Sequence, residues 1–423
     1  MKKIIVFTHN IVRDPITDDC LSVELKKQGH SVFRRAFLAD DKNMVLCTKP
    51  DIIVLPEIRC EYTRDYAKQC RDWGIKVVVR PCEVGISEES LETISEDYKR
   101  AIFGNWDINN CIDLMLCWGP KMADMFAKYG NIEASKITTV GGLAFDQFFL
   151  PEFPEEIQPS SKRRVLFATG FAYADRNAEY AVPEALPNDP LHRNMVAIDA
   201  KGRSEWFKVI KRFWAEHGND WDISVKLHPG EKEEVYRTVL KDTVSYCPNW
   251  PVVRALRHYD VVVHAGSTMA FEAHLLKKPA INLMNVCQDV IVSKISPNAS
   301  SYEEMVDLLK KSVPSAGCEL KSNADQSIVD ILKRDYYGTC DGKASERAAN
   351  AISSMPDAET KIPDDWPKSD DMKYITDCIL TCVEQWQCRG CGHNYHVRGP
   401  REMVKCPFCG IANAKIFHPQ SPK

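Results

Sequence analysis

The sequence predicts an α/β protein with two Rossmann-like domains that face a cleft, followed by a small cysteine-rich module. Two observations predict the domains. Short apolar, β-rich runs alternate with segments of helical periodicity, and this alternation restarts after a proline-rich acidic stretch at 151–159. Strands alternating with helices are typical of βαβ units around a parallel sheet that is buried on both faces. A third observation, two Cys-x-x-Cys pairs near the C-terminus, predicts the module.

Size and charge limit the classes of protein to consider. A chain of 423 residues can form two or three domains, and 44% hydrophobic with 27% charged residues excludes a disordered or fibrous chain. The 55 basic and 59 acidic residues give a net charge of −4, without the basic excess of nucleic-acid-binding proteins. The sequence has no run of 18 apolar residues, and its N-terminal apolar stretch of four is too short for an export signal. We therefore expect a cytoplasmic protein, with peripheral contact to the inner face of the membrane as an open alternative.

Residues 1–150 form the first predicted domain. Apolar runs predict four buried strands, and a further short strand is expected to end at Val140. Helical periodicity fills the intervals between them. The predicted strands are Ile4–Phe7, Ile52–Leu55, Val77–Val79 and Leu114–Cys117, and the predicted helices are Leu21–Gln28, Thr63–Trp73 and Lys121–Tyr129.

Residues 160–355 form the second predicted domain, in which the same alternation returns. A segment at 171–203 has no clear period and carries three prolines, so we expect a long loop or insertion there. The predicted strands are Arg164–Ala168, Asp222–Leu227, Asp260–His264 and Ala280–Leu283, and the predicted helices are Glu205–Glu216, Glu233–Leu240 and Thr268–Leu276.

A polar, proline-rich linker at 356–385, with a short helix over Met372–Gln385, leads into a predicted zinc ribbon at 386–418. Its two Cys-x-x-Cys pairs are separated by 14 residues and can place four thiolates around one Zn²⁺. Such a site is closed, so the zinc is expected to be structural. A pair of disulfides or a redox dithiol is the alternative. The ligands would be Cys388, Cys391, Cys406 and Cys409.

Two turns in the second domain are candidates for binding a phosphorylated ligand. His228 follows a predicted strand and precedes a helix, which is where ligands bind in doubly wound sheets. Gly266, Ser267 and Thr268 form a turn that opens another helix, whose free amides and dipole favour a phosphate. Glu272, one turn into that helix, can hydrogen-bond a ribose diol. The alternatives are an exposed turn histidine, an ordinary N-cap and a capping-box carboxylate.

These motifs, in this order, resemble the nucleotide-binding half of GT-B glycosyltransferases. The closest resemblance is to bacterial surface-carbohydrate (capsule or lipopolysaccharide) biosynthesis proteins, and it covers roughly residues 1–353. The Gly142-Leu143 pair departs from the Asn-Pro common in that family. Besides the two turns, the resemblance rests on Lys277–Ile281, Trp118-Gly119, Lys136–Leu143, Phe145-Asp146 and Asp341–Arg347.

The resemblance implies a metal-independent enzyme that moves a sugar from a nucleotide-activated donor to a surface-polysaccharide or glycolipid acceptor. It also implies a role for each candidate residue. His228 would contact donor phosphate or nucleotide, Ser267 and Thr268 the phosphates, and Glu272 the ribose. The loop from Thr169 and Gly170 would face the cleft. A phosphate leaving group stabilised by a helix terminus and an imidazole is consistent with these roles.

An inverting transferase also needs a base in the cleft. His9, Asp14, Glu57 and Glu83 follow predicted strands of the first domain, and we favour Glu83 because it leaves its strand in a loop shaped by proline and glycine. That loop resembles an acidic-glycine loop in related transferases that use cytidine-activated sugars.

Two other classes of function stay open. A sugar-nucleotide epimerase or a glycerophosphotransferase can use the same twin-domain scaffold. An inactive assembly protein of polysaccharide synthesis, docked to a protein partner through the ribbon, is the third class.

Overall fold

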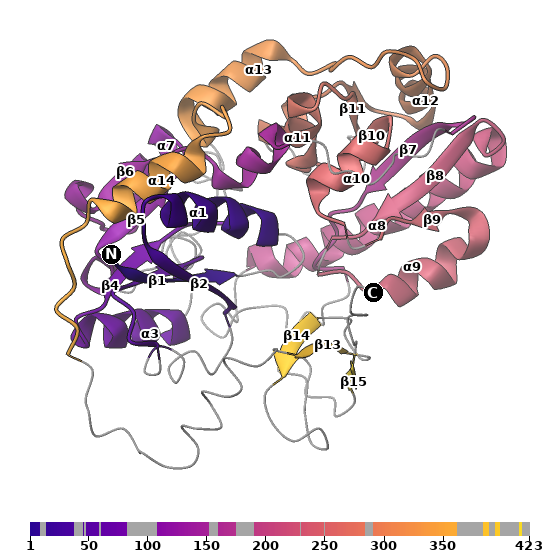
Figure 1. The fold of residues 1–423 in the computed structure, drawn as a ribbon. Helices are drawn as coiled ribbons and strands as arrows, with labels where there is room; N and C mark the ends of the chain where they lie inside the picture. The colour runs from indigo at the N-terminus through magenta and orange to yellow at the C-terminus, as the bar shows by residue number, and fades with distance from the viewer. Residues whose placement is uncertain are drawn as a thin grey trace, which may run out of the picture.

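The structure is a computed structural model that describes most residues of the chain. These are residues 1–8, 14–37, 45, 48–58, 61–82, 108–151, 160–174, 190–228, 230–248, 250–283, 291–361, 384–388, 394–397 and 414–416. Within them the chain forms two α/β domains that lie side by side, each built around its own sheet (Figure 1). The prediction of two Rossmann-like domains is confirmed.

The first domain contains a six-stranded parallel sheet of order β2-β1-β3-β4-β5-β6. Every residue of β3 and β5 is buried, as expected for apolar runs covered by helices on both faces. The strands are β1 (Lys3–Thr8), β2 (Ser31–Ala36), β3 (Ile52–Leu55), β4 (Lys76–Val79), β5 (Leu114–Cys117) and β6 (Ile137–Thr139). The helices are α1 (Pro15–Lys27), α3 (Glu61–Asp72), α6 (Ile108–Cys111) and α7 (Pro120–Tyr129), with 3₁₀ turns η1 (Ala134–Lys136) and η2 (Leu143–Phe149).

The second domain contains another six-stranded parallel sheet, of order β12-β11-β10-β7-β8-β9. Its strands are β7 (Arg163–Ala168), β8 (Trp221–Lys226), β9 (Ser245–Tyr246), β10 (Val261–His264), β11 (Ala280–Leu283) and β12 (Asn298–Ala299). Its helices are α8 (Pro190–His217), α9 (Glu233–Leu240), α10 (Val252–His258), α11 (Met269–Leu275), α12 (Tyr302–Ser312) and α13 (Gln326–Ile331), with 3₁₀ turns η3 (Lys241–Thr243) and η5 (Ile291–Lys294).

Two expectations about local structure were wrong. The segment at 171–203 was expected to be aperiodic, but α8 begins at Pro190 and runs for 28 residues. Proline is favoured at the first position of a helix, where its missing N–H is not needed, so Pro190 starts this helix rather than breaking it. The helix expected over Met372–Gln385 cannot extend to its predicted end, because β13 (Glu384–Cys388) is a strand. The rest of that predicted helix lies outside the described residues.

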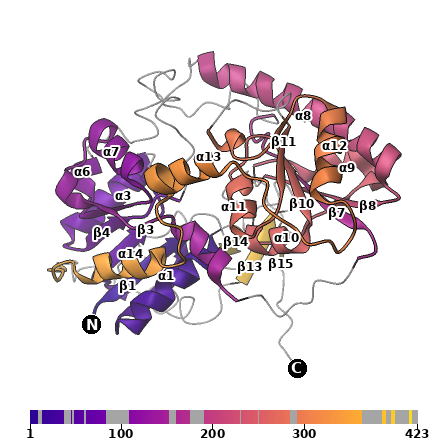
Figure 2. The same cartoon turned by 90° about the horizontal axis from the view of Figure 1, so that it is seen from above.

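The last helix of the second half returns to the first domain. After the π-helix η6 (Leu332–Tyr337), α14 (Ala344–Ser353) packs against α1, as Figures 1 and 2 show. Ala348 and Ile352 of α14 are fully buried in one cluster with Leu21 of α1. The carboxylate of Asp146 caps α14 by accepting hydrogen bonds from the amides of Ala344, at 3.1 Å, and Ser345, at 2.6 Å. The chain thus crosses between the domains a second time.

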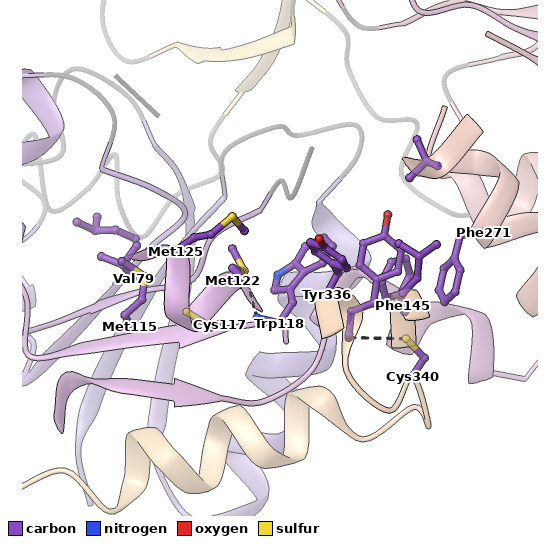
Figure 3. Close-up of a cluster of buried hydrophobic side chains, with 14 of the residues drawn as sticks. Val79, Met115, Cys117, Trp118, Met122, Met125, Phe145, Phe271, Tyr336 and Cys340 are labelled. Carbon is purple, nitrogen blue, oxygen red and sulfur yellow. Dashed lines mark hydrogen bonds between the residues drawn. The ribbon is translucent and has the colours of Figure 1, made fainter. Parts of the chain in front are cut away.

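A cluster of aromatic rings joins the domains where the chain crosses (Figure 3). The ring of Phe145, from η2, lies 5.0 Å from the ring of Phe271 in α11 and 5.0 Å from that of Tyr337 in η6. Trp118, which follows β5, completes the cluster and donates its indole N–H to the carbonyl of Pro81 at 2.8 Å. These rings are buried, and edge-to-face pairs of this kind add about 0.5–1.5 kcal/mol each beyond the area that they bury.

We predict that Phe145→Ala lowers the free energy of unfolding by about 3–5 kcal/mol, because it removes a buried ring that contacts both domains. Urea unfolding followed by circular dichroism measures the loss. The matched control is Phe149→Ala, in the same turn, whose side chain is 49% exposed and should cost far less. Equal losses in the two variants would contradict the view that this cluster joins the domains.

Candidate functional site

The predicted site residues of the second domain follow three neighbouring strands. Ala168, the last residue of β7, lies opposite both Lys226 at the end of β8 and His264 at the end of β10. The segments that leave these strands therefore meet at the carboxyl edge of the sheet, where doubly wound proteins bind ligands. A Cβ placed on Gly170 would lie 3.7 Å from the carbonyl oxygen of Ala265 in the next segment.

The turn after β10 is held by a buried histidine. His264 is fully buried, and loss of solvation lowers its pKa to about 3, so its ring is neutral. Its Nδ1 accepts the amide of Ser267 at 3.2 Å, so the ring proton is on Nε2, which lies 2.7 Å from the Ser296 hydroxyl. Gly266 adopts a φ of +67°, which favours glycine, and donates its amide to the Asn282 side chain at 2.9 Å. The side chains of His264, Asn282 and Ser296, from three parts of the domain, thus fix this turn.

We expected the amides at the start of α11 to be free, but several of them already have acceptors. Besides the amides of Gly266 and Ser267, that of Met269 is also engaged, donating to the Ser267 hydroxyl at 3.2 Å. Ser267 therefore acts as a local cap, and the exposed side chain is that of Thr268. The helix has seven residues. The turn can present the Thr268 side chain to a ligand, while three of its amides already have acceptors.

His228 is exposed, and a half-buried carboxylate fixes its loop. The Nδ1 of His228 accepts the amide of Gly230 at 3.1 Å. Glu231 accepts hydrogen bonds from the hydroxyls of Thr169 and Tyr236 and from the amide of His228, the last at 3.0 Å. Burial raises the pKa of Glu231, while these hydrogen bonds oppose the shift. Thr169, predicted to face the cleft, is instead buried and ties this loop to β7.

Sequence reasoning missed Glu231 as the residue that orders this loop. Its position three residues after His228, directly after a Pro-Gly turn, was the available signal, because a carboxylate at that spacing can reach back to the amide of the histidine.

Glu272 is half-buried in α11, next to the interdomain ring of Phe271. Its negative charge acts on two neighbouring groups. Burial raises the pKa of Tyr337 and the Glu272 charge adds to that rise, whereas burial lowers the pKa of Lys226 and the Glu272 charge opposes it. The Lys226 ammonium, at the end of β8, donates to the carbonyl of Trp250 at 3.0 Å. The carboxylate is therefore within electrostatic range of the end of β8 and of η6.

On the first-domain side, the favoured base Glu83 and the alternative His9 lie outside the described residues. Asp14 is buried and Glu57 is half-buried. The same edge holds a buried ion pair that the sequence did not reveal, in which Arg80, after β4, donates to Asp18 in α1. The side chains are 3% and 0% exposed, so the pair ties the start of α1 to the end of β4.

The described part of the chain offers no cluster of three or more metal-binding side chains. Of the four predicted zinc ligands, Cys388 ends β13, and Cys391, Cys406 and Cys409 fall outside the described residues. Three short strands in this region form an antiparallel sheet of order β14-β13-β15, with β14 at Asn394–Val397 and β15 at Ala414–Ile416. In the sequence, the first Cys-x-x-Cys pair begins at the last residue of β13, and the second comes between β14 and β15. None of the described helices is long and apolar enough to cross a bilayer.

Comparison with known proteins identifies the fold alone. No protein-family model and no curated protein matches the chain. Among solved structures, S. aureus MnaA in a co-structure with UDP has a TM-score of 0.50 and 15% identity, over 84% of this chain and 96% of that one. The UDP-GlcNAc 2-epimerase of Methanocaldococcus jannaschii scores 0.50 at 13% identity, over 83% and 99%. That of Neisseria meningitidis, bound to UDP-GlcNAc, scores 0.50 at 11%, over 84% and 100%.

We predict that His264 makes the protein less stable in acid. Its pKa is about 6.5 in the unfolded chain and about 3 in the fold, so the unfolded state binds more protons as the pH falls through this window. The stabilisation is complete above pH 6.5 and is lost by up to about 1.4 kcal/mol per pH unit below it.

Urea unfolding at pH 6.5 and pH 5 measures this loss. The parent should lose about 2 kcal/mol more than His264→Asn, which keeps an acceptor for the Ser267 amide but does not titrate. An identical pH dependence of the unfolding free energy in the two proteins would contradict the lowered pKa of His264.

Proposed function

We propose that this protein is a glycosyltransferase that moves a sugar from a nucleotide-activated donor to a surface-polysaccharide or glycolipid acceptor. The observation that carries the proposal is the convergence of three strand-end segments, after β7, β8 and β10, at one edge of the second sheet. The packing of α11 against the first domain, through Phe271 and Phe145, keeps this edge at the junction between the domains. A donor bound there would have its sugar directed toward the first domain.

Each candidate residue has a role in this proposal. The loop of His228 and Gly170 and the turn of Ser267 and Thr268 would surround the donor phosphates, and Glu272 would hydrogen-bond the ribose. Lys226, close to Glu272, would offset phosphate charge. Because the imidazole of His228 carries its proton on Nε2 when neutral, it can donate to a phosphate oxygen without being charged.

The reaction proposed is a displacement at the anomeric carbon. An acceptor hydroxyl forms the new bond, the bond to the donor phosphate breaks, and the phosphate leaves with the electron pair. Glu83 is proposed as the base that takes the proton of the hydroxyl, and His228 as the group that stabilises the leaving phosphate. No metal is required for either role in this scheme.

A sugar-nucleotide epimerase is the second candidate, because the solved structures that share the fold are titled as UDP-GlcNAc 2-epimerases or as a complex with UDP. Donor turnover distinguishes the two. A transferase releases nucleotide only when an acceptor is present, whereas an epimerase converts free nucleotide sugar by itself. Nuclear magnetic resonance of UDP-GlcNAc and CMP-linked sugars, incubated with and without acceptor glycan, records both products. A glycerophosphotransferase and an inactive assembly protein would both leave these two donors unchanged.

We predict that His228→Ala and Glu272→Ala each weaken binding of the cognate nucleotide by at least tenfold, because each removes a polar contact at the strand-end edge. Isothermal calorimetry measures the affinity, and the melting temperature checks that the fold is intact. Glu234→Ala, an exposed glutamate of α9, is the matched control and should bind as the parent does. Parental affinity in both site variants would exclude this site.

We also propose that the C-terminal residues form a zinc ribbon that docks the enzyme to a protein partner. In the sequence, one cysteine pair begins at the end of β13 and the other lies between β14 and β15, and four thiolates suit a tetrahedral Zn²⁺. Bound zinc would supply folding free energy that so small a module lacks.

We predict about one zinc per chain in protein purified without chelator, measured by inductively coupled plasma mass spectrometry. Replacing both Cys388 and Cys406 by serine should abolish it, because two thiolates leave too few ligands. Cys318→Ser, a half-buried free cysteine of the second domain, should keep it. Absence of zinc from the parent protein would remove the ribbon from the account.

A further inference from the structure

A second concave site lies along β9, the outermost strand on one side of the second sheet. It is a groove of about 470 Å³, bounded by β8, both residues of β9 and the C-terminal ends of α8 and α10. One end lies at Trp221, roughly 17 Å of strand away from Lys226 at the other end of β8. The other end lies at Trp250, whose carbonyl accepts a hydrogen bond from the Lys226 ammonium at 3.0 Å, so the groove ends beside the proposed nucleotide site.

Six of the sixteen residues that line this groove have aromatic side chains. Trp214 is 46% exposed there, although indole rings are usually buried. Tyr246 and Trp250 are half-buried, Trp221 forms a buried part of the wall, and the ring of His258 lies 5.2 Å from that of Trp250. Rings of this size bury much area at little conformational cost, which suits binding of a ligand with flat apolar faces.

An arginine lies over each of three of these rings. The guanidinium carbon of Arg163 is 4.5 Å from the centre of Trp221, and that of Arg254 is 4.4 Å from Trp250. Arg237 is likewise 4.3 Å from Tyr246. These cation–π contacts hold the rings in place before any ligand arrives, so a ligand would lose less free energy in ordering them.

The charges around the groove largely cancel. Arg163 pairs with Asp220 at 3.7 Å, Arg164 with Asp260 at 3.3 Å, and Arg237 with Glu233. The C-terminal ends of α8 and α10 add the negative poles of two helices at the same place. A polyanion needs cations without partners, so this lining does not favour nucleic acid or an acidic polymer. It favours an uncharged ligand that is rich in hydroxyl groups.

Polar side chains lie beside the rings. Exposed Ser245 and Asp222 line the groove together with Lys162. The Thr243 hydroxyl already donates to the carbonyl of Leu240, and Ser224 is buried. Lys162 donates to the carbonyl of Gly218, just past the end of α8, at 3.0 Å, so its ammonium is held at the rim. A pyranose ring presents C–H groups on its faces and hydroxyls around its edge, which matches aromatic walls with polar groups between them.

We propose that this groove binds an uncharged saccharide chain, as a second carbohydrate site that ends beside the proposed donor site. The interpretation that this chain is the acceptor glycan rests on the proposed function. Saccharide binding itself does not, because it follows from the rings, the paired charges and the exposed polar groups of the groove. A growing chain held here would stay attached to the enzyme between transfers.

The test uses the full-length protein without any nucleotide. Cellohexaose, maltohexaose and chitohexaose are the neutral probes, with a heparin hexasaccharide and a uridine dodecamer as anionic probes. Saturation-transfer NMR detects binding, and quenching of tryptophan fluorescence gives the affinity. We expect at least one neutral probe to bind, and Trp214→Ala to weaken it at least tenfold. Because Trp214 is half exposed, its removal should leave the melting temperature nearly unchanged.

Three further variants make the result specific. Trp250→Ala should also weaken saccharide binding, whereas Trp73→Ala, a half-buried tryptophan of the first domain, should not. Glu272→Ala should keep full saccharide affinity, so that failure of the nucleotide site and failure of the groove are distinguishable. Tighter binding of either anionic probe, no binding of any neutral probe, or parental affinity in both groove variants would overturn the proposal.

Discussion

Packing of aromatic rings across the domain junction determines where the candidate site lies. Phe271 of α11 contacts Phe145 of the first domain and Tyr337 of the returning segment, with ring centres 5.0 Å and 4.7 Å away. Glu272 follows Phe271 in the same helix, so the packing of one residue positions the next. The turn before α11 is fixed in turn by buried His264. The strand ends of the second domain are therefore held beside the first domain without any ligand.

The sequence was sufficient to predict five of the six strands of the first sheet, four of the six of the second, and the edge at which the candidate residues meet, but it missed β2. Apolar runs of four residues reveal buried parallel strands, and every residue after such a strand emerges at the same edge. Periodicity could not reveal β9 and β12, which are two residues long, or the start of α8 at Pro190. Short edge strands contain too few residues to show a period.

A second limit on prediction from the sequence is that several contacts join residues far apart in it. Arg80 and Asp18 are 62 residues apart, and the Ser296 that contacts His264 is 32 residues away from it. No local pattern encodes such pairs, because they depend on how the elements pack. The prediction of free amides at the start of α11 was wrong for the same reason, because the Asn282 side chain of the neighbouring strand accepts a hydrogen bond from one of them. Chemistry that depends on sequence spacing was predictable, and chemistry that depends on packing was not.

The second domain has different chemistry at two places on one sheet. The carboxyl edge carries His228, Thr268 and Glu272 beside the junction, where a phosphorylated donor is proposed to bind. The groove along β9 carries rings with paired charges, where an uncharged chain is proposed to bind. Thermal-shift titration of the full chain with CMP, CDP, UDP and GDP tests the central claim most directly, because a ligand of the folded state stabilises it by about 2.7 kcal/mol at 100 times its Kd. The account predicts that one nucleotide raises the melting temperature well above the others and continues to do so with the logarithm of its concentration. No shift with any of the four at millimolar concentration would contradict it.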